Sequence, residues 1–222
     1  MESRRRFRLA TIAAAVVLSW FSLVTILAEA LTPAPPELAQ SAARQAGQMS
    51  DDQGADWLAA AAPLRGDLLA DVALARAIPV IDLGTPAASP EVPARRESAL
   101  ALARQSLGFA PHDSRAWLLI AMLQAGGRSS AATTEALKMS FLTAPSDPGL
   151  IPARLGVLAT STTTDDGELA SLARGDMRLI LTRRPDLKSA IVRAYDKGST
   201  KGKALIRDIA RALDPAFAAT LH

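Results

Sequence analysis

The chain has 222 residues, no cysteine and a net charge of +3. The absence of cysteine excludes disulfides, thiol catalysis and thiolate metal sites. Apolar residues make up 49% of the chain, but aromatic residues make up only 4%. Because this composition favours helices packed through small side chains over a β-sheet, we expect an all-α fold.

Charge is unevenly distributed along the chain. Residues 31–171 carry 10 basic and 15 acidic side chains, whereas residues 172–222 carry 11 basic and 5 acidic side chains. The C-terminal quarter is therefore cationic, and an acidic partner is the class that this imbalance favours.

The N-terminal residues 1–30 predict a membrane anchor. Four arginines between Arg4 and Arg8 precede an uncharged stretch of 20 residues from Leu9 to Ala28. At about 1.5 Å per residue, a helix of this length matches the roughly 30 Å hydrocarbon thickness of a bilayer. The one-sided arginines predict a single pass through a bacterial inner membrane, with a cytoplasmic N-terminus and a periplasmic domain. The alternative is a cleavable signal peptide, because Ala28-Glu29-Ala30 fits the small-x-small cleavage pattern.

A spacer and a helical domain follow. Residues 31–50 contain the stiff stretch Thr32-Pro33-Ala34-Pro35-Pro36 and a first short helix, and residues 51–222 are expected to form the domain. The apolar spacing favours no strand and predicts helices at 37–47, 51–61, 66–77, 94–108, 114–125, 130–142, 148–159, 166–182, 187–196 and 201–213.

Several short signals predict where these helices begin and end. The four prolines between Ile78 and Pro93 predict a long loop. Asp113 is placed to cap the helix that follows it, and Asp165 with Glu168 forms a pair like a capping box. Gly126-Gly127 indicates a tight turn between two antiparallel helices.

An internal repeat becomes visible when the chain is compared with itself at an offset of 34 residues. This offset aligns Ala99 with Thr133, Ser106 with Ser140, Leu107 with Phe141 and Pro111 with Pro145. The segment from Ser114 to Asp147 resembles a tetratricopeptide repeat. The positions that carry the resemblance, as candidate repeat-packing residues, are Trp117, Ile120, Ala121, Thr133, Leu137, Ser140 and Pro145.

The resemblance covers this repeat and the second helix of the preceding one. Gln124 stands where the family prefers tyrosine, and Thr133 and Ser140 replace alanines. The resemblance implies a degenerate array of helical hairpins, and a nonrepetitive helical bundle is the alternative. The chain also looks like small uncharacterised single-pass proteobacterial envelope proteins associated with surface-polysaccharide systems, notably in Pro63–Leu68 and Ala136–Phe141.

The expected helix at 201–213 has a basic face. Lys203, Arg207 and Arg211 recur every four residues, apart from an apolar stripe of Leu205, Ile209 and Leu213. A docked terminal helix with a solvated face is one interpretation. The other is attraction to an anionic glycan or to phospholipid headgroups, with these three residues as candidate contacts.

The sequence contains no complete motif for catalysis or metal binding. Gly198–Lys203 resembles a phosphate-binding loop, but it has three residues between its glycines where four are needed, so a helix N-terminal turn is the better interpretation. His112 and His222 are too few for a zinc site. Asp67 and Asp71 share a helix face, as a general acid and base would, although solvated surface carboxylates are the simpler interpretation. We expect no catalytic residue, metal or cofactor.

These observations predict a protein that is not an enzyme. We expect a membrane-anchored scaffold of the cell envelope whose hairpins bind a partner protein, with surface-polysaccharide assembly or export as the pathway that the second resemblance implies. The alternative is a binding module for anionic polysaccharide or a phospholipid surface. We expect no nucleic-acid partner, because the domain is predicted to be translocated.

Overall fold

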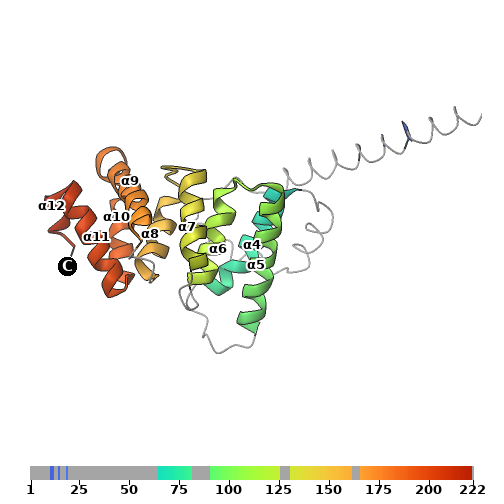
Figure 1. Cartoon of the computed structure of the whole chain (residues 1–222), viewed down its shortest axis with the longest axis horizontal. Coiled ribbons are helices and arrows are strands. Elements are labelled where there is room, and N and C mark those ends of the chain that lie inside the picture. The colour runs from blue at the N-terminus through green and yellow to red at the C-terminus, as the bar shows by residue number, and fades with distance from the viewer. Residues whose placement is uncertain are drawn as a thin grey trace, which may run out of the picture.

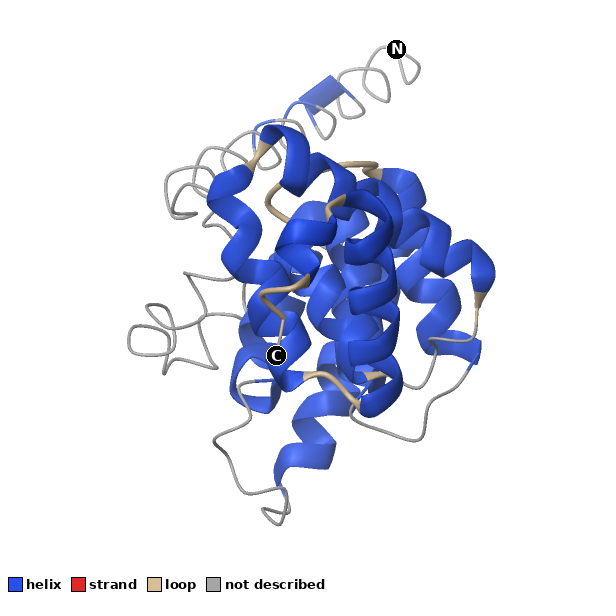
Figure 2. Ribbon diagram, turned by 90° about the vertical axis from the view of Figure 1, so that its left-hand side faces the viewer, coloured by secondary structure: helices blue, strands red, loops and turns tan. Residues whose placement is uncertain are grey.

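The computed structural model describes residues 65–81, 91–125, 131–161 and 166–221, together with Thr11, Ile12, Ala15 and Ser19. Every regular element in these ranges is a helix and none is a strand, so the predicted all-α fold is confirmed (Figure 2). The predicted helices at 37–47 and 51–61 lie outside the described residues.

The described helices fall close to the predicted ones. Their bounds are α4 (Gly66–Ile81), α5 (Glu91–Phe109), α6 (Ser114–Ala125), α7 (Ala131–Thr143), α8 (Ile151–Thr160), α9 (Gly167–Arg183), the 3-10 helix η2 (Pro185–Leu187), α10 (Lys188–Lys197), α11 (Thr200–Leu213) and α12 (Pro215–Ala218).

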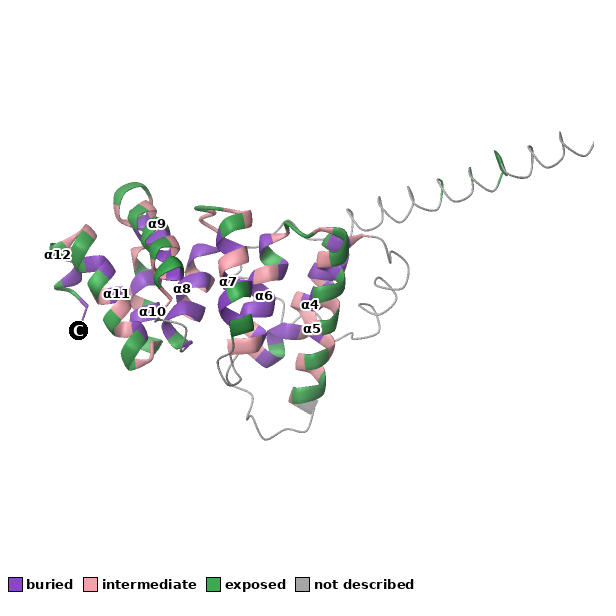
Figure 3. Ribbon diagram, viewed as in Figure 1, coloured by how far each residue is buried: buried purple, intermediate pink, exposed green. Residues whose placement is uncertain are grey.

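Helices α4 and α5, and likewise α6 and α7, pack as consecutive pairs, whereas α8 packs chiefly against α10. The helices follow one another in a row along the long axis of the molecule (Figure 1). The most extensive contacts are those of α4 with α5 and of α6 with α7. Along the row, α4, α6, α8 and α10 are successive neighbours in one layer, while α7, α9 and α11 are successive neighbours in the other. Buried residues lie between neighbouring helices, and the outer side of α5 is largely exposed (Figure 3).

Small residues allow neighbouring helices to approach closely. Ala99 and Ser106 on α5 are fully buried, and so are the residues aligned with them, Thr133 and Ser140 on α7. A side chain at Gly66 would place its Cβ 2.8 Å from the carbonyl oxygen of Ser106, which is closer than real contacts allow. The start of α4 can therefore lie directly on α5 only because glycine stands there.

The predicted loop from Ile78 to Pro93 is wrong at both of its ends. Helix α4 continues through Pro79 to Ile81, and α5 begins at Glu91. Ile78 and Val80 are buried, and this burial favours continuation of the helix in spite of the proline between them. Pro93 lies in the first turn of α5, where a helix needs no amide donor from it.

The second half of the row is held together through α8 and α11. The amide of Ser199 donates to the Ala159 carbonyl oxygen at 2.8 Å, so the N-terminus of α11 lies on the last turn of α8. A Cβ at Gly202 would be 2.0 Å from that same oxygen. At the far end, Asp214 caps α12 by accepting the Phe217 amide at 3.0 Å, and Leu221 is buried in the common core.

None of the described helices is long and apolar enough to cross a membrane. The predicted span from Leu9 to Ala28 lies outside the described residues, except for Thr11, Ile12, Ala15 and Ser19, which are helical.

Candidate functional site

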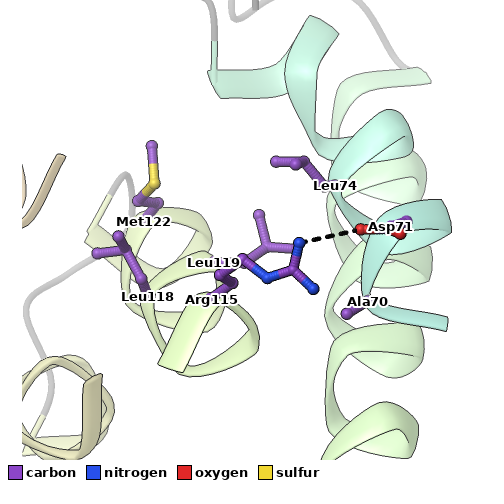
Figure 4. A pocket seen from close by; sticks show the side chains of 7 residues that line it. All are labelled: Ala70, Asp71, Leu74, Arg115, Leu118, Leu119 and Met122. Carbon is purple, nitrogen blue, oxygen red and sulfur yellow. Dashed lines mark hydrogen bonds and ion pairs between the residues drawn. The ribbon is translucent and has the colours of Figure 1, made fainter. Parts of the chain in front are cut away.

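A surface hollow lies between α4 and α6, and we call it the α4–α6 groove. It is shallow and open to solvent, with a volume of about 20 Å³. Its lining residues are Ala70, Asp71, Leu74, Arg115, Leu118, Leu119 and Met122. Leu74 and Met122 are only half-buried, so the two walls present apolar side chains to whatever enters between them (Figure 4).

The polar part of the α4–α6 groove is an ion pair across the two helices. The Arg115 Nη1 atom lies 3.5 Å from the Asp71 Oδ1 atom, and the side chains are 43% and 38% exposed (Figure 4). Partial burial raises the pKa of Asp71, and the Arg115 guanidinium acts in the opposite direction. At this distance and exposure the pair is weak, so both groups are available to form new hydrogen bonds.

Asp67 and Asp71 do not form an acid-base pair in a shared pocket. The Arg65 guanidinium donates to the Asp67 carboxylate, and this hydrogen bond lowers the pKa of Asp67. Asp71 pairs instead with Arg115 on α6. Two aspartates with separate arginine partners act as surface carboxylates, which agrees with the simpler of the two predictions.

The candidate repeat-packing residues divide into two groups. Ile120, Ala121, Thr133, Leu137 and Ser140 are buried between α6 and α7 or against the neighbouring pairs. The other two, Trp117 and Pro145, are not core residues.

Trp117 is half-buried at the edge of the core, where its Nε1 atom donates to the Pro111 carbonyl oxygen at 2.7 Å. This hydrogen bond therefore stabilises the turn between α5 and α6. Pro145 is exposed two residues beyond the end of α7, so it follows the helix and does not lie in the core.

The three candidate anion contacts on α11 have different surroundings. Lys203 and Arg207 are half-buried over the ring of Tyr195, whereas Arg211 is exposed and pairs with Asp208 at 3.2 Å. The predicted helix N-terminal turn at Gly198–Lys203 is confirmed, because the Ser199 hydroxyl caps α11 by accepting the Gly202 amide.

A buried charged centre joins α7, α8 and α9. Arg154 on α8 is 0% exposed and Asp176 on α9 is 2% exposed. The Arg154 guanidinium donates to the Ser140 hydroxyl at 3.0 Å, to the Ser140 carbonyl oxygen, and to the Ala144 carbonyl oxygen at 3.0 Å. It also lies 4.9 Å from the centroid of the Phe141 ring. Arg154 thus binds the C-terminal carbonyls of α7, where a cation is favourable.

Arg154 interacts less closely with Asp176 than with the C-terminal end of α7. The Asp176 Oδ2 atom lies 3.6 Å from Arg154 Nη1, which is too long for a hydrogen bond. Burial raises the pKa of Asp176 to about 6, with Arg154 and the Ser146 amide acting to lower it and Asp147 to raise it. The prediction from sequence missed this pair. A signal was present, because Arg154 falls on the apolar stripe of Ile151, Leu155 and Leu158.

A second bridge between α7 and α9 lies nearer the surface. Lys138 Nζ is 2.8 Å from Asp166 Oδ2 and 2.9 Å from Glu168 Oε2, with Glu135 at 3.7 Å. Asp166 also caps α9 by accepting the Leu169 amide. These hydrogen bonds raise the pKa of Lys138 and lower that of Asp166.

The sequence carried no signal for the α4–α6 groove, because its walls come from helices separated by the whole of α5. Among the described residues, no group of acidic, histidine or cysteine side chains is arranged to hold a metal ion. Comparison with protein-family models, curated proteins and solved structures gave no match.

Proposed function

We propose that the chain is a membrane-anchored, non-enzymatic scaffold of the bacterial cell envelope, in which the stacked helix pairs bind a partner protein. The observation that carries the proposal is the α4–α6 groove. It combines an apolar lining with one weakly paired arginine and aspartate. Such a site suits an apolar side chain of a helical or extended segment, with polar groups that fix its orientation.

The row of helix pairs supports a binding role rather than a catalytic one. Stacked helices present long surfaces that can bind a segment of a partner, and a membrane anchor would hold the surface close to partners in the same membrane. The anchor, the periplasmic location and the tetratricopeptide-like character of the pairs remain predictions from sequence. A reporter fused directly after Pro36 tests the location, and activity in the cytosol with none in the periplasm would contradict the proposal.

Site-specific photo-crosslinking in intact cells tests the groove. A photoreactive residue replaces Leu74 or Met122 in the groove, and the matched control carries it at Leu142, an exposed apolar position on α7. We expect Leu74 and Met122 to trap the same envelope protein and Leu142 to trap none. Equal yields at all three positions, or no discrete product from the groove, would count against the proposal.

The identity of the cross-linked partner tests whether the protein acts in surface-polysaccharide assembly or export. A component of surface-polysaccharide assembly or export would support the expectation that rests on the resemblance. A different envelope protein would retain the scaffold function and exclude this pathway. Met122→Glu, which places a charge in the apolar groove, should prevent capture, and Leu142→Glu should not.

A further inference from the structure

Two cations of α11 gather over one buried aromatic ring of α10. Tyr195 is 2% exposed. Lys203 Nζ lies 5.4 Å from the ring centroid, and Arg207 Cζ lies 5.1 Å from it. The Arg207 guanidinium also donates to the phenolic oxygen of Tyr195. Each cation is attracted to the ring, and the two residues stand one turn apart on the same face of α11, although their like charges repel each other.

Within the described ranges, no carboxylate pairs with either of these cations. Arg211, one turn further along α11, is by contrast matched with Asp208. Lys203 retains its three N–H donors, because its ammonium group lies over the face of the ring. The Tyr195 hydroxyl accepts from Arg207 and keeps its own O–H donor. Apart from the bond of Arg207 to the phenolic oxygen, the described part of the chain supplies no hydrogen-bond acceptor to Lys203, to the other N–H groups of Arg207 or to the Tyr195 O–H group.

We infer that Lys203, Arg207 and Tyr195 form a binding site for a phosphate-type oxyanion. A phosphate group is close to a dianion near neutral pH, which balances both cations, and its oxygens can accept from all three side chains. A carboxylate would neutralise only one of the two charges. Both cations are half-buried, which suits a discrete anionic group better than the plane of a membrane, where protruding basic side chains are needed.

The site is also fixed in position before any ligand binds. Gly202, next to Lys203, lies against the last turn of α8, and Ser199 caps the helix that carries both cations. Tyr195 is held in the common core. This anchoring lowers the entropic cost of ordering the donors when an anion binds. The inference is independent of the proposed scaffold function, because the site and the α4–α6 groove share no residue.

Calorimetric titration of the full chain with inorganic phosphate tests the site. We expect saturable binding that weakens with added salt. Lys203→Gln and Arg207→Gln should each weaken binding about tenfold or more, because each removes a charged hydrogen bond. Tyr195→Phe keeps the ring but loses the hydroxyl, and should weaken binding about fivefold. The matched control is Lys197→Gln, an exposed cation at the end of α10, which should leave affinity within about twofold.

Two further ligands distinguish the source of the phosphate group. Preference for methyl phosphate, which can carry two negative charges, would indicate free phosphate or a monoester. This result supports the site when Lys203→Gln weakens binding about tenfold or more and the helical circular dichroism is unchanged. Preference for dimethyl phosphate, which carries one negative charge, would indicate a diester such as a lipid headgroup and would overturn the assignment of a dianion that balances both cations. The inference is overturned if wild-type protein shows no saturable binding at millimolar phosphate, or if Lys197→Gln weakens binding as much as Lys203→Gln.

Discussion

Replacing Asp176 with asparagine should raise the free energy of unfolding near neutral pH, although the change removes one member of a buried ion pair. Burial raises the pKa of Asp176 from 3.8 to about 6 in the folded protein. The folded state therefore holds a proton that the unfolded state has already released. The contribution of Asp176 to stability is full below pH 3.8 and is lost as the pH rises through about 6. At about 1.4 kcal/mol per pKa unit, the loss amounts to about 3 kcal/mol.

The geometry explains why the arginine does not reverse this effect. The nearest approach of the two groups is 3.6 Å, between Arg154 Nη1 and Asp176 Oδ2. The other guanidinium nitrogens, Nε and Nη2, donate to Ser140 and to the Ala144 carbonyl. Asp176 thus bears the cost of leaving water without a hydrogen bond from its partner.

Urea unfolding of wild-type protein and of Asp176→Asn, measured from below pH 3.8 to above pH 6, tests the reasoning. Subtracting the free energy of unfolding of one protein from that of the other at each pH removes the contribution of all other titrating groups. We expect similar stabilities at the acidic end and a more stable asparagine variant, by about 3 kcal/mol, at the neutral end. Asp208→Asn, an exposed carboxylate on α11, is the control and should change stability by less than about 0.5 kcal/mol. A wild type that is more stable than Asp176→Asn near neutral pH would show that the attraction of Arg154 outweighs burial, and would refute the argument.

Three further predictions concern how the helices pack. Gly202→Ala should destabilise the protein by about 3 kcal/mol, because its Cβ would meet the backbone of α8. Gly175→Ala on α9, where the space around the glycine is open, should stabilise the protein by about 0.5 kcal/mol, and thermal unfolding distinguishes the two signs. Lys138→Met should lower the melting temperature by removing the bridge between α7 and α9, and the difference from wild type should shrink at high salt. Ala99→Leu should lower the free energy of unfolding by about 1–3 kcal/mol, because the larger side chain overpacks the contact between helices. Ala101→Leu, at an exposed position of the same helix, should be nearly neutral, and equal effects of the two substitutions would contradict the proposed role of small residues.

Apolar periodicity located the helices of the described ranges because it reports burial directly. The bounds of α6 at Ser114–Ala125 match the prediction, and α11 differs from it by one residue. Asp113 caps α6, as predicted, by accepting the Arg115 amide at 2.9 Å. The N-cap of α9 is Asp166, which accepts the Leu169 amide, and the predicted Asp165 lies outside the described residues.

Features that depend on distant segments could not be predicted. Burial of Ile78 and Val80 decides that α4 passes through Pro79, and it is set by neighbouring helices rather than by local preference. The basic face of α11 was identified from its spacing, but the spacing did not reveal that Tyr195 lies beneath two of its cations. Arg154 could have been noticed as a charge within an apolar stripe, although its partner on α9 could not.

The short helix α12 has a consequence for self-association. A row of helix pairs has an apolar surface at each end, and copies that stack through such ends can grow into filaments without limit. Here α12 packs on α11, and Ala218 and Leu221 are buried in the common core. The helix therefore covers apolar surface of α11 that a second copy would otherwise contact, which disfavours head-to-tail stacking through that surface.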